Sequence, residues 1–279
     1  MSTDVLFLGL DGAEPDLIRH WAGQGELPVM GQLLDNWWSA DLATPPGFGD
    51  GVFWATLYTG CNAGRHGHYF PWQFDQRNYA INSFPYDTHF RRDPFWMYAS
   101  KMGRRVGIID MYTAPLVQGM NGIQVMDWMI HDRTGDPRSW PESAIGALHD
   151  YYMADPLEGN SETKGRSEPE WVAFHQQMLD RLEAKTRALV DTVGGNTWDL
   201  FAGNWCDAHD GGHQSWHWHD PASPAHDPEF LARHGDPLLA IYRALDAGVG
   251  RVIDAAGARQ VFLVAGLGMG IQTTCNPVS

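Results

Sequence analysis

The amino-acid sequence predicts an α/β fold in which helices cover both faces of a mostly parallel β-sheet. Short apolar segments of strand length alternate along the 279 residues with longer amphipathic segments, which is the order expected of βαβ units. Acidic residues, histidines or glycines follow several apolar segments directly, at positions that correspond to the carboxyl ends of strands, where α/β sheets bind ligands. We expect a single domain over residues 1–279 with a shortened C-terminal end.

The first 60 residues predict one strand and three helices. The continuous apolar run at residues 5–10 indicates a buried strand, and this run stops at Asp11. A short helix capped by Asp16 is expected next, and a second helix begins at Pro28. Residues 44–51 are turn formers, and they lead into a third helical segment.

The rest of the chain contains segments with clear periodicity and one segment without it. Residues from about 113 to 166 are rich in glycine, proline and aspartate, so we expect a loop-rich insertion or cap there. The longest helix should end at Gly194-Gly195. Further strands are expected at 105–112, 198–204 and 260–265, and further helices at 95–101, 170–193 and 236–256.

Composition and charge exclude several classes of protein. The net charge of −15 argues against binding to nucleic acid or to an anionic membrane surface, because both need clustered lysine and arginine. The three cysteines have no CxxC spacing, which favours a reducing compartment over a disulfide framework. No basic leader precedes the first strand, and no apolar run approaches the roughly 18–20 residues of a membrane span. We therefore expect a cytoplasmic protein that acts on a small-molecule substrate.

Two aspartates stand at positions where a ligand would bind. Asp11 follows the first strand and precedes a glycine, so its carboxylate is a candidate metal ligand; the alternative is an aspartate that caps the next helix. Asp50 lies in the sequence GFGDG immediately before a helical segment. The helix dipole and free backbone N–H groups favour an acidic residue there, so plain N-capping is an alternative to catalysis.

The segment DAHDGGHQSWHWHD at 207–220 is the richest in candidate ligands. His209 and His213 are four residues apart, a spacing that lets both imidazoles reach one ion from a helix or a tight turn. Gly211 and Gly212 favour the turn. A coincidental cluster of histidines is the alternative, but the position directly after a predicted strand favours a metal site.

Several neighbouring residues are expected to support the site rather than bind metal. Asp207 and Asp210 flank His209 and are candidates to accept a hydrogen bond from an imidazole N–H. His66 is expected to pack or hydrogen-bond beneath the site. Asp110 is expected to stabilise a loop. Cys206 and Cys275 are expected to be buried structural cysteines, because neither has a partner at ligand spacing.

Three segments of the sequence together resemble a known family. They are GLDGAEPDLIRHWAGQGELPVMGQLL at 9–34, WATLYTGCNAGRHGHY at 54–69 and HDGGHQSWHWHDP at 209–221. The combination is similar to the type I phosphodiesterase/nucleotide pyrophosphatase branch of the alkaline phosphatase superfamily, and the similarity extends over most of the chain. The resemblance implies a three-layer alkaline phosphatase-like fold, two divalent metal ions, usually zinc, and a covalent nucleophile. It assigns Asp11 to the first metal aspartate, and His209 and His213 to a metal-binding pair.

The sequence departs from the family pattern at the nucleophile and at one metal-binding motif. Asp50 stands where the family has threonine or serine, ten residues before Gly60. The family motif Ser-Asp-His-Gly is replaced by Ala-Gly-Leu-Gly at 265–268, so both ligands of that motif are lost. We therefore expect one ion instead of two. Its predicted ligands are Asp11, Asp50, His209 and His213, and this mixed nitrogen and oxygen set suits zinc first, with iron or manganese as alternatives.

These observations leave three functions open. The first is a metal-dependent hydrolase of phosphate, phosphonate or sulfate esters, in which metal-bound water or Asp50 attacks the substrate. The second is a repurposed metalloenzyme with a different metal chemistry, for which iron-dependent redox chemistry is one candidate. The third is a non-catalytic member of the family that binds a ligand, a second copy of itself or a companion subunit through an exposed sheet edge.

Overall fold

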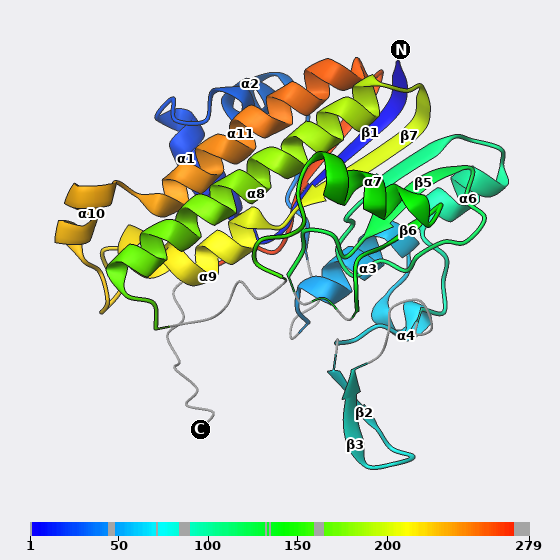
Figure 1. Ribbon diagram of the computed structural model, residues 1–279, viewed down its shortest axis with the longest axis horizontal. Helices are drawn as coiled ribbons and strands as arrows, with labels where there is room; N and C mark the ends of the chain where they lie inside the picture. Colours follow the sequence, from blue (N-terminus) through cyan, green and yellow to red (C-terminus); the bar gives the residue numbers. More distant parts are fainter. Residues whose placement is uncertain are drawn as a thin grey trace.

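The main β-sheet is built as the sequence predicts. The computed structural model of the protein describes residues 2–43, 48–70, 72–83, 90–131, 133, 135–158 and 165–270. Within these residues the sheet consists of β1 (Thr3–Leu10), β4 (Val106–Ile109), β5 (Gly122–Met126), β6 (Arg138–Trp140), β7 (Trp198–Trp205) and β8 (Gln260–Ala265). The strand order is β6-β5-β4-β7-β1-β8, and every pairing is parallel except that of β5 with β6 (Figure 1). The predicted mostly parallel sheet is confirmed.

Helices pack on both faces of this sheet. Two long helices, α8 (Glu168–Gly194) and α11 (Pro237–Ala256), run side by side across one face (Figure 1). The core on this face also includes residues of α1 (Pro15–Gly23), α2 (Pro28–Asn36) and α9 (Asp207–His219). The opposite face packs against α3 (Asp50–Thr59) and α6 (Phe95–Lys101). The remaining helices in the described residues are α4 (Ala63–His66), α7 (Ser143–Tyr151) and α10 (Pro228–His234).

Burial on both faces explains the continuous apolar run at the start of the chain. Leu6, Leu8 and Leu10 contribute to the core beneath α8 and α11, whereas Phe7 contributes to the core beneath α3. Successive side chains of a strand point to opposite faces, so a strand that is covered on both sides needs apolar residues at every position. The same reasoning places the carboxyl end of β1, and with it Asp11, between the two helical layers.

The two long helices begin at well-defined caps. Ser167 and Glu170 form a capping box at the start of α8. The side chain of Asp236 accepts hydrogen bonds from the backbone N–H groups of Leu238 and Leu239 at the start of α11. The predicted helices at 170–193 and 236–256 are confirmed to within two residues at each end. None of the helices in the described part of the chain is both long and apolar enough to cross a membrane.

Two expectations about local structure were wrong. Residues 113–166 were expected to form a loop-rich insertion or cap, but they contribute β5 and β6 to the main sheet and also contain α7. These strands are five and three residues long, too short to produce a visible period in the sequence.

A separate hairpin of β2 (Trp72–Asp75) and β3 (Ala80–Ser83), which extends away from the sheet, was not predicted (Figure 1). The single-domain organisation over residues 1–279 stays a prediction.

The second error concerns residues 207–219, which form the helix α9 and not the expected turn. Gly211 lies inside this helix for a packing reason: a Cβ atom added to it would lie 2.4 Å from Cδ1 of Ile241 on α11. The glycine therefore permits the close approach of α9 to α11, and tertiary packing outweighs its low helix propensity.

Candidate metal centre

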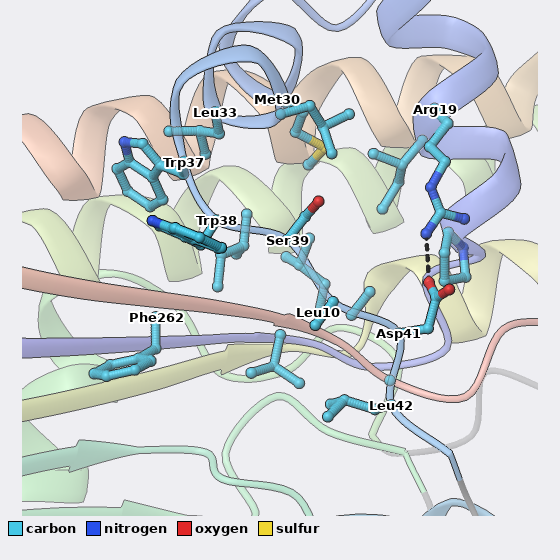
Figure 2. Close-up of a pocket in the computed structure, with 18 of the residues that line it drawn as sticks. Leu10, Arg19, Met30, Leu33, Trp37, Trp38, Ser39, Asp41, Leu42 and Phe262 are labelled. Carbon is cyan, nitrogen blue, oxygen red and sulfur yellow. Dashed lines mark hydrogen bonds and ion pairs between the residues drawn. The ribbon is translucent and has the colours of Figure 1, made fainter.

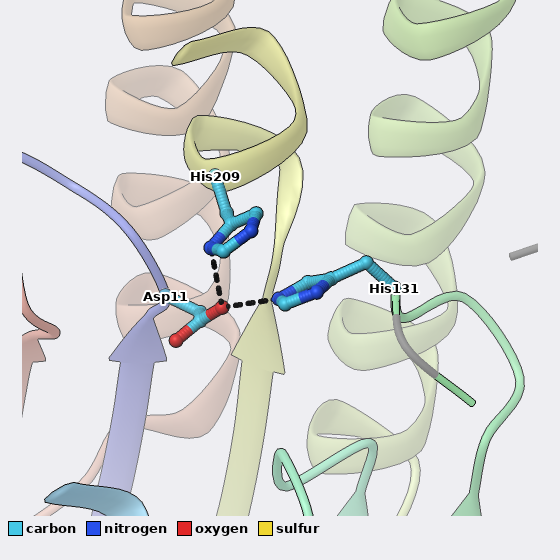
Figure 3. A group of neighbouring side chains, drawn as sticks. All are labelled: Asp11, His131 and His209. Carbon is cyan, nitrogen blue, oxygen red and sulfur yellow. Dashed lines mark hydrogen bonds and ion pairs between the residues drawn. The ribbon is translucent and has the colours of Figure 1, made fainter. Parts of the chain in front are cut away.

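Three buried donor atoms from distant parts of the chain converge at the carboxyl ends of the strands. Oδ2 of Asp11 lies 2.7 Å from Nε2 of His131 and 3.5 Å from Nδ1 of His209 (Figure 3). The three side chains are at most 8% exposed, and one donor atom of each lies within 4.8 Å of the others. A carboxylate oxygen and two imidazole nitrogens at such distances are a suitable set of ligands for a divalent metal ion.

The end of β1 brings Asp11 against α9. The backbone N–H of Asp11 donates to the carbonyl oxygen of Trp205, the last residue of β7, so the parallel pairing extends as far as the aspartate. Gly12 then turns the chain with a φ of +66°, and a Cβ atom at this position would lie 2.5 Å from Cα of His209. Both the backbone conformation and the close contact require glycine. Gly12 therefore lets the first turn of α9 approach Asp11.

His131 lies five residues beyond β5, in a turn that is held by Asp110. The two carboxylate oxygens of Asp110 accept hydrogen bonds from the backbone N–H groups of Trp128, at 2.9 Å, and Met129, at 2.8 Å. The expectation that Asp110 stabilises a loop is thus met, and the loop is the one that carries a donor atom. The His131 ring stacks between those of Tyr112, 4.5 Å away, and His209, 3.6 Å away.

Two buried cations on α8 contact the segments that carry His131 and His209. Nζ of Lys185 donates to the carbonyl oxygen of Met129 at 2.6 Å and lies 2.9 Å from Oδ2 of Asp110. One turn earlier, the guanidinium of Arg181 contacts the carboxylates of Asp207 and Asp210 in the first turn of α9. Lys185 thereby fixes the turn before His131, and Arg181 fixes the helical turn that carries His209.

Burial and charge act in opposite directions on these ionisable groups. Burial lowers the pKa of Arg181, but the carboxylates of Asp207, Asp210 and Asp155 outweigh it and raise this pKa well above the usual value. Burial raises the pKa of Asp207, and the nearby cations Arg181 and Lys185 oppose this shift only in part. Asp207 and Asp210 were expected to accept a hydrogen bond from an imidazole; the contacts seen here join them to Arg181.

His213 lies beside the donor cluster, on the opposite edge of the His209 ring. Nε2 of His213 is 3.0 Å from Nε2 of His209, whereas Nδ1 of His209 faces Asp11. The four-residue spacing on α9 therefore brings the two imidazoles together, as the sequence indicated. The contact uses Nε2 of His209, whereas Nδ1 of the same ring faces the carboxylate of Asp11. Coordination of the same ion by His213 stays a prediction.

Asp50 is the first residue of α3, so the predicted loop-to-helix boundary is confirmed. Its side chain lies outside the described residues, and its predicted roles as ligand and as nucleophile stay predictions. One turn further along α3, the indole Nε1 of Trp54 donates a hydrogen bond to Oδ1 of Asp11. Helix α3 is therefore in direct contact with the candidate metal centre through Trp54.

The turn after β8 lies against Asp11 but offers no ligand. The backbone N–H of Gly266 donates to the carbonyl oxygen of Leu10 at 2.8 Å, so this turn directly adjoins the end of β1. The residues at 265–268 are alanine, glycine, leucine and glycine, none of which has a metal-binding side chain. The expected loss of ligands at this position is therefore visible in space as well as in sequence.

His66 and Cys206 have structural environments. The ring of His66 is buried: Nδ1 accepts a hydrogen bond from the backbone N–H of His68, and Nε2 lies 3.2 Å from Oγ1 of Thr56. Burial lowers the pKa of His66, which favours the neutral ring. Burial also raises the pKa of Cys206, so its thiol stays protonated and is a poor metal ligand. Cys275 lies outside the described residues.

The donor cluster fits a single divalent ion in charge and in size. In the form that binds metal, one carboxylate and two imidazoles contribute a total charge of −1, which a divalent ion would more than offset. Ligand bonds of about 2.0–2.2 Å place the donors of one ion roughly 3 Å apart, and the separations of 2.7 and 3.5 Å lie on either side of that value. The two separations from Oδ2 of Asp11 are therefore compatible with coordination of one ion.

An apolar pocket of about 410 Å³ lies next to this end of the sheet (Figure 2). Its walls are α1, α2, the segment after α2 and the strand β8, and the ion pair of Arg19 with Asp41 lies among its lining residues (Figure 2). Leu10 and Gly266 also line it, but Asp11 and the two imidazoles do not. The pocket adjoins the candidate centre without containing its donor atoms.

His131 is the donor that sequence reasoning missed. The available signal was its position: Gly122–Met126 is a short apolar strand, and His131 follows in the sequence DWMIHD. Because the carboxyl ends of parallel strands gather at one edge of the sheet, a histidine after β5 belongs with the aspartate after β1. The signal was hidden because the surrounding residues were assigned to a loop-rich insertion.

Comparison with known proteins agrees with this architecture. The family model described as type I phosphodiesterase / nucleotide pyrophosphatase matches residues 5–276. Two crystal structures of phosphonoacetate hydrolase from Sinorhizobium meliloti 1021, one in complex with phosphonoformate and one with phosphonoacetate, are similar in fold. Each has a TM-score of 0.56, with 14% and 13% sequence identity respectively.

The structural similarity covers 93% of this chain and 55% of each phosphonoacetate hydrolase chain, so this chain spans about half the length of those proteins. At such low identity, the similarity establishes the fold alone. No curated protein matches the sequence. The family model, in contrast, matches nearly the whole chain. The protein therefore belongs to the type I phosphodiesterase/nucleotide pyrophosphatase family of the alkaline phosphatase superfamily.

Proposed function

We propose that this protein is a metal-dependent hydrolase of phosphate, phosphonate or sulfate esters that uses a single divalent ion. The observation that carries the proposal is the convergence of Asp11, His131 and His209 in a buried cluster at the strand ends. Membership of a family of metal-dependent phosphoesterases supports the reaction class. Zinc is the proposed ion, because two imidazoles and a carboxylate with an open position are typical of catalytic zinc sites.

The charge of the protein favours an ion at this site. The net charge of −15 repels an anionic ester at long range. A divalent ion would offset this repulsion locally and, when bound, would polarise the ester and lower the pKa of a bound water. The similar solved structures are in complex with phosphonoformate and phosphonoacetate, which are small anions. We accordingly propose small phosphate or phosphonate esters as the first substrates to test.

His213 is proposed to hold His209 in the tautomer that binds metal. If His209 binds the ion through Nδ1, its proton must be on Nε2, which then donates to Nε2 of His213 at the observed 3.0 Å. His213 is only partly buried, so its ring can exchange a proton with solvent. A bound ion would supply the activated water that acts as nucleophile in the primary mechanism, and Asp50 at the start of α3 is the alternative nucleophile.

Metal analysis combined with an esterase assay tests the proposal. Purified protein should contain about one zinc ion per chain and should hydrolyse bis(p-nitrophenyl) phosphate or a p-nitrophenyl phosphonate. His131→Ala should lose both the zinc and the activity, whereas His20→Ala, an exposed histidine on α1, should lose neither. Hydrolysis that persists in metal-free His131→Ala would refute the mechanism.

The donor set also supports a second function. Two histidines and one carboxylate with open positions form the ligand pattern of non-haem iron oxygenases, and this similarity concerns ligand type rather than fold. Under this alternative the protein isolated without added metal contains iron, consumes oxygen with a suitable reductant, and lacks esterase activity. A protein that binds neither metal would fit a non-catalytic role, as a binding module for a ligand or a companion chain.

A further inference from the structure

The two carboxylate oxygens of Asp11 contact different partners, and Trp54 is the partner of one of them. Its side chain is fully buried, and its indole Nε1–H donates to Oδ1 of Asp11. The other oxygen, Oδ2, faces Nε2 of His131 and Nδ1 of His209. The donor cluster is therefore on one side of the carboxylate, and an N–H donor is on the other.

An indole N–H is a fixed donor that a metal ion cannot replace easily. It has no acceptor capacity and does not ionise in proteins, so its hydrogen atom always presents positive charge to its partner. Trp54 is also held in place: its ring meets that of Phe53 edge-on, with centroids 5.3 Å apart, within the core beneath α3. A cation that approached Oδ1 would have to displace this buried ring.

We propose that Trp54 restricts Asp11 to binding through Oδ2 alone, and so limits the centre to one ion. Chelation through both oxygens, or a bridge from Oδ1 to a second ion, would require the position that the indole N–H occupies. This inference rests on the proposed function, because it concerns the same ion. It adds a positioning residue that determines how many ions the site accepts.

A second observation independently favours a single ion. The turn at 265–268 lies against the end of β1 through the hydrogen bond from Gly266 to Leu10, but its four residues offer no donor side chain. A second ion near Asp11 would therefore lack ligands from this turn, in addition to facing the indole of Trp54.

The test compares two tryptophan-to-phenylalanine variants from the same core. Trp54→Phe removes the N–H group and keeps an aromatic ring. Trp96→Phe is the matched control, because Trp96 is equally buried in the same cluster and its Nε1 has no hydrogen-bond partner among the described residues. For each protein, zinc content is measured by mass spectrometry, zinc affinity by competition with a chelator, and zinc coordination by X-ray absorption.

The wild-type protein and Trp96→Phe should bind one zinc ion with a single oxygen from Asp11. Trp54→Phe should bind zinc about 10–100-fold more weakly, as is typical when a partner of a metal ligand is removed, with an added oxygen in its coordination shell. Equal affinity and coordination in the two variants would overturn this inference alone. Two ions in the wild-type protein would overturn the inference together with the single-ion part of the proposed function, but would leave metal-dependent hydrolysis standing. A wild-type protein without affinity for zinc would overturn the proposed function, and the inference with it.

If Trp54→Phe does not fold, the wild-type protein still decides the question. In a crystal structure with zinc bound, Oδ1 of Asp11 should remain on Nε1 of Trp54, beyond ligand distance of the ion. Direct coordination by Oδ1 would contradict the inference.

Discussion

Lys185 donates to the backbone carbonyl of Met129 at 2.6 Å, and this hydrogen bond joins the centre of the longest helix to the turn that carries His131. The ammonium group also lies 2.9 Å from Asp110, which accepts hydrogen bonds from the backbone of the same turn. Lys185 and Asp110 therefore hold the turn that leads to a candidate metal ligand, His131.

Replacement of Lys185 by methionine should weaken metal binding. The substitution leaves the carboxylate of Asp110 buried without its cation, which costs about 3–5 kcal/mol for a buried pair, and loosens the turn before His131. We expect zinc affinity to fall about 10–100-fold, measured by chelator competition at a temperature where the variant is folded.

Arg187→Met is the matched control for this substitution, because Arg187 is on the same helix but exposed. Its affinity for zinc should be unchanged. Addition of Asp110→Asn to Lys185→Met should recover part of the stability, since it removes the uncompensated charge. A Lys185→Met variant that binds zinc as tightly as Arg187→Met would show that Lys185 does not position the site.

The two histidines next to His209 should respond differently to alanine substitution. His131→Ala removes a donor of the buried cluster and should abolish stoichiometric zinc binding. His213→Ala removes a contact to the opposite nitrogen of His209 and should reduce zinc affinity only about 10–100-fold. Equilibrium dialysis with zinc measures both. Complete loss in His213→Ala with full retention in His131→Ala would instead support the ligand pair that the sequence predicts, His209 and His213.

Arg181→Met should destabilise the fold more than any exposed substitution. Arg181 is fully buried, and its removal leaves two carboxylates, those of Asp207 and Asp210, without their cation. We expect a loss of about 3–5 kcal/mol in the free energy of unfolding, measured by urea denaturation. Arg181→Met combined with Asp207→Asn should recover part of this loss. A double variant less stable than the single one would contradict the role assigned to the charges.

Alanine at Gly211 should be destabilising despite its better helix propensity. The new Cβ would overlap Cδ1 of Ile241, and overpacking of this kind costs about 1–3 kcal/mol, more than the gain of about 1 kcal/mol in propensity. Gly146→Ala in α7 is the control, because among the described residues no atom beyond its chain neighbours and the backbone of its own helix lies within 4 Å of the added methyl group. It should stabilise by about 0.5–1 kcal/mol. Thermal unfolding of the two variants should therefore shift in opposite directions.

The ion pair of Asp236 with His219 should give a pH-dependent contribution to stability. Burial raises the pKa of Asp236, but the hydrogen bond and charge of His219 and the helix N-terminal N–H groups outweigh it, so the pKa is lowered. A carboxyl group with a lowered pKa stabilises the fold above its unfolded pKa of about 3.9, and this stability is lost as the pH falls through the folded value.

Asp236→Asn should therefore be less stable than the wild-type protein by about 1 kcal/mol near pH 6. The difference should begin to shrink below about pH 4 and should disappear once the pH is below the lowered pKa of Asp236 in the folded protein. Urea denaturation at several pH values measures this difference. A difference that grows on acidification would contradict the assigned direction of the shift.

The main elements could be predicted from the sequence because their signals are local. The apolar run at residues 5–10 and the amphipathic pattern after Asp236 give β1 and α11 within two residues of their observed ends. Asp11 directly follows β1 and His209 lies four residues after β7, and both residues were recognised because the sequences of these strands are clear. These are the two members of the predicted ligand set that the described structure brings into the buried cluster.

The missed features depend on contacts between distant residues. His131 is placed by Asp110 and Lys185, which are 21 and 54 residues away in sequence, and no local pattern encodes that contact. Helix α9 was missed because Gly211 lowers helix propensity, and only the packing of Ile241 against it explains why glycine is there. The position of His131 and the helical conformation of residues 207–219 therefore depend on tertiary packing, which local propensity does not report.

The position of a bound zinc ion tests the central claim most directly. Crystals of the zinc-loaded protein, measured on both sides of the zinc absorption edge, would locate the ion by its anomalous signal. We predict one peak per chain, at about 2.0–2.2 Å from Oδ2 of Asp11, Nε2 of His131 and Nδ1 of His209. An anomalous peak elsewhere, or none at this cluster in protein shown to contain zinc, would contradict the account.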